Sequence, residues 1–91
     1  MERLIESLLA CANAHGYNSE YVSEYNQVVV FGIGVPLLSD LRDIVMAFYG
    51  IGCGDCVDAD DSWGTTTIYL DEYEFLDEVD EDRLKMALPR K

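Results

Sequence analysis

The chain has 91 residues, of which 49% are hydrophobic and 26% are charged, and its net charge at pH 7 is −12. This length predicts a single domain over residues 1–91, and the apolar content is too high for a disordered acidic tail. The negative charge argues against direct binding to nucleic acid or to anionic membranes, because it repels both.

The first half of the chain predicts a helix followed by a β-hairpin. Apolar side chains recur at the helical period over Arg3–His15, and Gly16 suits the end of that helix. Residues 17–25 and 27–33 are rich in Tyr and Val, which predicts two strands that turn at Tyr25-Asn26.

The second half repeats this order. Gly34-Val35-Pro36 ends the strand, and a second helix is predicted from Ser39, as N-cap, to about Gly50. Cys56–Asp60 and Thr65–Leu70 then predict a second hairpin.

The C-terminal part predicts a short, frayed helix between Asp77 and Leu88. The order α-β-β-α-β-β predicts an α+β two-layer sandwich, in which two helices cover one face of a four-stranded, mainly antiparallel sheet. It is also the element order of a circularly permuted ferredoxin-like fold, an analogy that carries no function.

The cysteine content predicts reduced thiols. Three cysteines are an odd number, which argues against a disulfide framework. The charged residues 1–6 do not resemble a secretory signal, and no apolar run reaches the roughly 20 residues that span a bilayer. We therefore expect a cytoplasmic protein.

Two cysteine patterns raise the question of redox or metal chemistry. In Cys53-Gly54-Asp55-Cys56 the acidic surroundings raise the thiol pKa, which disfavours thioredoxin-like chemistry. Cys11 and His15 lie four residues apart on a helix and, with Cys53 and Cys56, would complete a Cys₃His zinc set. Antiparallel helices would separate His15 from Cys53, so we expect no metal and no cofactor, with a small zinc-binding protein as an alternative.

Catalytic motifs are missing from the sequence. The chain has one histidine, and its only nucleophile-and-base pair in register, Cys11 and His15, lies on an apolar helical face. The residues from Asp58 do not match the pattern of a calcium-binding loop, because Trp63 stands where Gly is required and Tyr69 where Glu is required. We expect a protein that is not an enzyme.

The whole net charge lies between Asp55 and Asp82, where twelve acidic residues occur without a Lys, Arg or His. Asp58 and Asp60 share one face of a predicted strand, as Glu72 and Glu74 would if the strand continued, about 6.6 Å apart. Such a ladder of negative charge resembles a phosphate backbone.

Aromatic residues are interleaved with these acids, a combination found at protein interfaces. Trp63 is either an exposed anchor at the hairpin tip or a residue that closes the core. We predict that the run binds a basic protein surface. The predicted partner-binding residues are Asp58, Asp60, Asp61, Trp63, Tyr69, Asp71, Glu72, Tyr73, Glu74, Asp77, Glu78, Asp80 and Glu81.

These features predict a small acidic, non-catalytic inhibitor that occupies the nucleic-acid-binding surface of another protein. In size, charge and lack of catalytic residues the chain is similar to phage anti-defence proteins, such as anti-CRISPR proteins. The alternatives are an immunity protein or antitoxin that neutralises a basic nuclease, and the zinc-binding protein.

Overall fold

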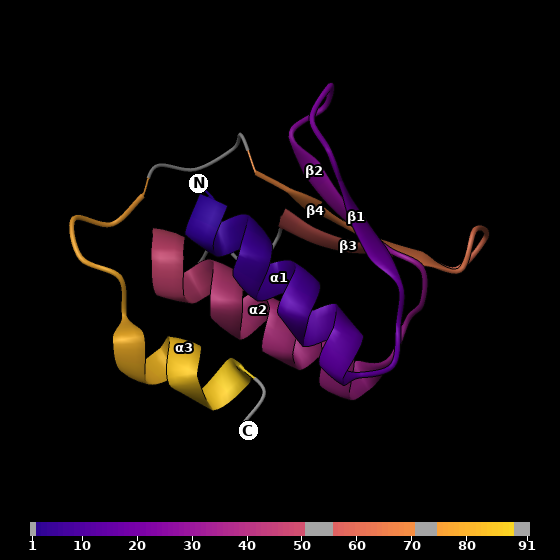
Figure 1. Cartoon of the computed structure of the whole chain (residues 1–91). Helices are drawn as coiled ribbons and strands as arrows, with labels where there is room; N and C mark the ends of the chain where they lie inside the picture. The colour runs from indigo at the N-terminus through magenta and orange to yellow at the C-terminus, as the bar shows by residue number, and fades with distance from the viewer. Residues whose placement is uncertain (1, 51–55, 71–74, 89–91) are drawn as a thin grey trace.

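The computed structural model describes residues 2–50, 56–70 and 75–88. Figure 1 shows the elements that these residues form. In chain order they are α1 (Glu2–Ala14), β1 (Ser19–Val22), β2 (Gln27–Val30), α2 (Val35–Tyr49), β3 (Val57–Asp60), β4 (Thr65–Tyr69) and α3 (Glu81–Ala87).

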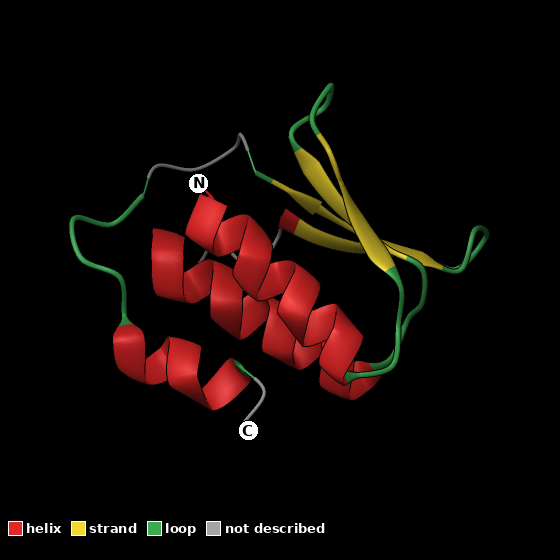
Figure 2. Cartoon of the chain, viewed as in Figure 1, coloured by secondary structure: helices red, strands yellow, loops and turns green. Residues whose placement is uncertain are grey.

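The four strands form one antiparallel sheet in the order β1-β2-β4-β3. The helices lie together on one side of this sheet (Figure 2). The predicted α+β two-layer sandwich is therefore confirmed. Helices α1 and α2 run antiparallel, so that the end of α1 lies beside the start of α2 (Figure 1).

The core lies between the sheet and the helices. Helices α1 and α2 bury apolar side chains at the helical period of 3.6 residues, and the central strands β2 and β4 bury every second residue, which directs one side of each element inward. Thr66 is the buried polar exception on β4, and its hydroxyl donates to the Gly32 carbonyl oxygen at 2.8 Å. The fully buried side chains include Leu4, Leu8, Leu37, Leu41, Ile44, Val45, Val28, Val30 and Ile68.

The strand register divides the sheet into a core face and an uncovered face. Ile68, in the central strand β4, is buried and pairs with the buried Val28 and Val57, so their neighbours along each strand point to the opposite side. No described helix covers that side (Figure 2). We call it the open face, and its residues are Glu20, Val22, Gln27, Val29, Asp58, Asp60, Thr65, Thr67 and Tyr69.

Helix α2 begins earlier than the sequence suggested. The predicted N-cap at Ser39 is wrong, because the helix starts at Val35 and Gly34 occupies the N-cap position with an extended backbone. Pro36 lies in the first turn. Proline is favoured there because its fixed φ suits a helix and its missing N–H would have no helical partner.

The C-terminal helix is shorter than predicted and is held against α2. It begins at Glu81 rather than Asp77, with Asp80 as N-cap. The preceding loop donates two backbone hydrogen bonds of 2.8 Å to the end of α2, from Leu76 to Phe48 and from Asp80 to Ala47. The segment is therefore docked on α2 before α3 begins.

The connection from β2 to α2 passes close to the Tyr17 ring. A Cβ atom added to Gly32 would lie 2.0 Å from Cδ1 of Tyr17, far inside van der Waals contact. The backbone can take this path only because residue 32 has no side chain.

Candidate functional site

Apart from Tyr69, the described residues of the predicted site fall into two groups at opposite ends of the molecule. The turn between β3 and β4 lies at one end, and the segment that precedes α3 lies at the other (Figure 1). Asp71, Glu72, Tyr73 and Glu74 are outside the described residues. All the described acids of the run are exposed, as expected, namely Asp58, Asp60, Asp61, Asp77, Glu78, Asp80, Glu81 and Asp82.

The first group, Asp58, Asp60 and Asp61, we call the hairpin acids. Asp58 and Asp60 lie on β3, an edge strand, opposite Thr67 and Thr65 of β4. Their side chains therefore share the open face, as the alternation of the strand predicted. Among the described residues, no cation forms an ion pair with any of the three. Their negative charge is left available to a partner.

The turn that joins β3 to β4 presents a tryptophan. A hydrogen bond from the Ser62 N–H to Asp60 Oδ1 (2.9 Å) and one from the Gly64 N–H to the Asp60 carbonyl oxygen (2.9 Å) hold the turn. Gly64 has φ +65°, a conformation that glycine adopts without strain. Trp63 is 81% exposed, so it does not close the core at the hairpin end.

The middle of the open face is less charged than its margins. One row crosses the sheet from Glu20 through Val29 and Thr67 to Asp58. Tyr69 lies next to this row on β4 and is half-buried. Acidic groups at both edges of an aliphatic and hydroxyl centre suit a partner with basic groups around a flat apolar contact.

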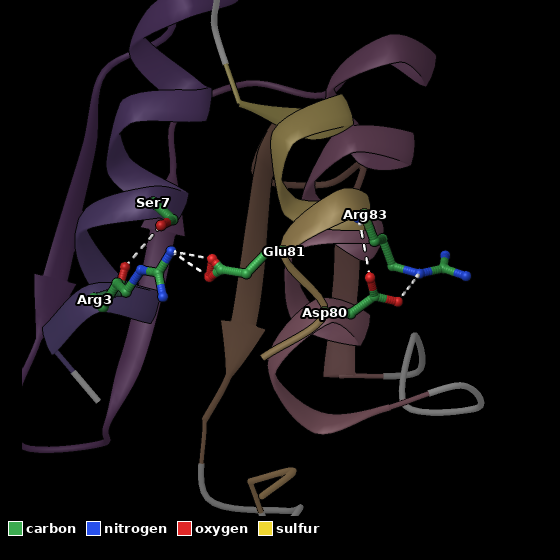
Figure 3. Close-up of polar contacts among 5 residues, drawn as sticks. All are labelled: Arg3, Ser7, Asp80, Glu81 and Arg83. Carbon is green, nitrogen blue, oxygen red and sulfur yellow. Dashed lines mark hydrogen bonds and ion pairs between the residues drawn. The ribbon is translucent and has the colours of Figure 1, made fainter. Parts of the chain in front are cut away.

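In the second group, Asp80 and Glu81 take part in the fold. Glu81 forms an ion pair with Arg3 of α1, with 2.6 Å between Oε1 and Nη2 (Figure 3). Asp80 Oδ1 accepts a hydrogen bond from the Arg83 backbone N–H at 3.2 Å, and Asp80 Oδ2 lies 3.8 Å from Nε of the Arg83 side chain (Figure 3). Arg83 also pairs with Asp43 of α2 at 3.2 Å. Glu81 and Arg83 therefore attach the C-terminal segment to α1 and α2, whereas the Asp80 side chain bonds within the segment.

A separate cluster joins the end of α1 to the start of α2. His15 Nε2 lies 2.8 Å from Asp40 Oδ2, and Cys11 is buried beside them. One ligand atom from each residue lies within 4.8 Å of the other two. The sequence predicted Cys11 and His15 as neighbours but missed Asp40, which antiparallel helices bring to them.

The chemistry of Cys11 does not favour nucleophilic catalysis. Burial, with a smaller contribution from the Asp40 carboxylate, raises the pKa of the Cys11 thiol to about 12. The thiol therefore keeps its proton at neutral pH and is a poor nucleophile.

The predicted Cys₃His set is not assembled among the described residues. Cys56 is buried next to β3 and is not part of the Cys11–His15–Asp40 group. Cys53 lies outside the described residues. The topology that the sequence implied, with His15 at the far end of the helix pair from the start of β3, accounts for the separation.

The comparisons with known proteins give no family for this chain. No family model, curated protein or solved structure matches it. In the described part of the chain, every helix is too short or too polar to cross a lipid bilayer. Inferences about function therefore rest on the surface and on the cluster.

Proposed function

We propose that this chain is a small acidic, non-catalytic inhibitor that occupies the basic surface of a nucleic-acid-binding protein. In this proposal the hairpin acids take the positions of phosphate groups, and Trp63 makes the central apolar contact. The observation that carries it is the combination, on one hairpin, of a tryptophan that is 81% exposed and three exposed carboxylates that form no ion pair with any described residue.

The hairpin acids and the exposed Trp63 ring both lower the stability of the folded chain, which supports a binding role for this surface. Uncompensated carboxylates repel one another and destabilise a compact state, and an exposed indole ring forgoes the free energy of burial. Charge on an edge strand also discourages pairing with other sheets, and this explains part of the pattern at Asp58 and Asp60. It does not explain Trp63, because an apolar ring beside an edge favours association.

The finer proposal is a nucleic-acid mimic of the phage anti-defence or anti-CRISPR type, which would act in the cytoplasm. Asp58 and Asp60 stand about 6.6 Å apart on one strand face, a repeat close to the spacing of successive phosphates on a single strand. An immunity protein or antitoxin that binds a basic nuclease would use the same surface. The identity of the captured partner separates these two proposals.

A charge-reversal experiment tests the proposal. The chain is immobilised and exposed to bacterial lysate, a purified CRISPR effector complex and a restriction enzyme. The partner is then tested for competition between the chain and nucleic acid. The Asp58→Lys/Asp60→Lys variant should weaken binding by about tenfold or more, because it places repulsive charge at the contact.

The matched control is Asp77→Lys/Glu78→Lys, which makes the same change in charge at the other end of the molecule. It should retain most of the affinity. Binding should also weaken strongly as the Debye length falls from about 10 Å at 0.1 M salt to about 3 Å at 1 M. An acidic partner, binding that is insensitive to salt, or equal losses in the two variants would overturn the proposal.

A further inference from the structure

The Cys11–His15–Asp40 cluster brings together three kinds of metal-binding side chain. Cys11 and His15 are four residues apart on α1, which places them on one helical face. Asp40 reaches them from the first half of α2, because the two helices are antiparallel (Figure 1). The cluster therefore depends on tertiary packing and not on a local sequence motif.

The donor set is the one that zinc prefers. Thiolate sulfur, imidazole nitrogen and carboxylate oxygen bind Zn²⁺ at about 2.0–2.3 Å, which places tetrahedral ligand atoms about 3–4 Å apart. The Cys11 thiol is protonated without the ion and would release its proton to solvent as the sulfur–zinc bond forms. The three ligand atoms of the cluster lie within 4.8 Å of one another, and His15 Nε2 is 2.8 Å from Asp40 Oδ2. Side-chain movements of about 1 Å, which would also separate the His15–Asp40 pair slightly, would arrange the three atoms around an ion. Calcium and magnesium, which require oxygen ligands, do not suit a site with sulfur and nitrogen.

The surroundings leave one side of the cluster open. Cys11 is 1% exposed and closes the inner side, whereas the His15 and Asp40 side chains are 25% and 33% exposed. An ion can therefore enter from solvent and keep a water molecule as its fourth ligand. This combination of three protein ligands and one exchangeable position is common for zinc.

We propose that Cys11, His15 and Asp40 form a site for one zinc ion, which links the end of α1 to the start of α2. The site is independent of the proposed inhibitory function, because its residues belong to the helix layer and not to the open face. Cys11 belongs to the apolar core, whereas the His15 and Asp40 side chains are partly exposed at its edge. Because the ion would bind the folded state and not the unfolded chain, it should add stability to the fold.

Cobalt provides a direct probe of the proposed site. After treatment with a chelator and its removal, the full chain is titrated with Co²⁺ while the visible and near-ultraviolet spectrum is recorded. Wild type should bind one Co²⁺ per chain, with a thiolate-to-cobalt charge-transfer band and the intense d–d bands of tetrahedral cobalt. Adding Zn²⁺ should remove these bands.

Variants assign the ligands. Asp40→Asn and His15→Gln, at half-exposed positions, should reduce the affinity for Co²⁺ by at least tenfold, and Cys11→Ser should abolish the charge-transfer band. Circular dichroism of each metal-free variant verifies its fold. The matched control, Cys53→Ser/Cys56→Ser, removes the other two thiols and should leave the spectrum unchanged.

The melting temperature gives an independent reading. Zn²⁺ should raise the melting temperature of the wild type and of the Cys53→Ser/Cys56→Ser control but not that of His15→Gln. The proposal is overturned if wild type gives no thiolate-to-cobalt band or if the band survives Cys11→Ser. It is also overturned if the band is lost in the control, which would move the site to Cys53 and Cys56.

Discussion

The β3–β4 hairpin and the C-terminal segment (residues 75–88) are both rich in acidic residues, yet the structure uses these residues differently. On the hairpin, Asp58, Asp60 and Asp61 are exposed and have no ion pair among the described residues. In the C-terminal segment, Asp80 caps α3 and Glu81 pairs with Arg3. A run of like charge in a sequence is therefore not a single functional unit.

The difference between the two regions comes from the neighbouring cations and apolar residues. Arg3 and Arg83 lie beside the C-terminal acids, and the segment buries Leu84 and Ala87 against the rest of the molecule. The hairpin instead presents Trp63 to solvent. We therefore expect substitutions in the C-terminal segment to change stability and substitutions on the hairpin to change binding.

The largest expected effect on stability is that of Leu84→Ala. Leu84 is 2% exposed, and truncation of a buried leucine leaves a cavity. The free energy of unfolding, measured by urea denaturation, should fall by about 2–5 kcal/mol. The control in the same helix is Met86→Ala, at a position that is 79% exposed, and it should change stability by less than about 0.5 kcal/mol. Equal effects of the two substitutions would show that α3 is not docked as described.

Trp63→Ala should leave stability nearly unchanged and weaken binding of the partner by about 2 kcal/mol or more. The reason is that the ring is exposed in the free protein and is expected to be buried in the complex. Tyr25→Ala is the matched control, because Tyr25 is an exposed aromatic residue at the tip of the other hairpin. Should Tyr25→Ala weaken binding more than Trp63→Ala, the interface includes the β1–β2 hairpin instead.

Asp80→Ala should lower the free energy of unfolding by about 1 kcal/mol, because it removes the N-cap of α3. Asp80→Asn keeps an acceptor oxygen for the Arg83 N–H and should retain most of that stability. A comparison of the two by thermal denaturation separates the cap from the ion pair with Arg83. If both variants lose equal stability, the charge of Asp80 matters more than its capping hydrogen bond.

The smallest expected effect is that of Glu81→Gln. The carboxylate forms an exposed ion pair with Arg3, and such pairs contribute about 0–1 kcal/mol. Urea denaturation at low and high salt should show a loss that becomes smaller as salt is added. A loss much greater than 1 kcal/mol would mean that this pair is essential for holding the C-terminal segment.

Local patterns were sufficient to predict most of the fold. The helical period of α1 and the strand and turn signals of the two hairpins depend on neighbouring residues, so the element order and the sheet could be predicted. The start of α2 could not be predicted correctly. Gly34 and Pro36 are typical of a break between elements, but glycine also occurs as an N-cap and proline in the first turn of a helix. Asp77 was placed in a helix that in fact begins only after the cap at Asp80.

The site was harder to predict because its properties depend on residues far apart in the sequence. The shared face of Asp58 and Asp60 follows from strand alternation alone. By contrast, the pairing of Glu81 with Arg3 joins opposite ends of the chain, and that of Asp40 with His15 requires two packed helices. The antiparallel helices implied by the element order were the available signal for Asp40.

Because Tyr17 lies so close to Gly32, the residue types allowed at these two positions depend on each other. A side chain at position 32 would overlap the Tyr17 ring, so divergent relatives should retain glycine there as long as an aromatic residue occupies position 17. A larger residue at position 32 should occur only together with a smaller one at position 17. This paired constraint is a structural signature by which distant relatives could be recognised even after their surface charges have changed.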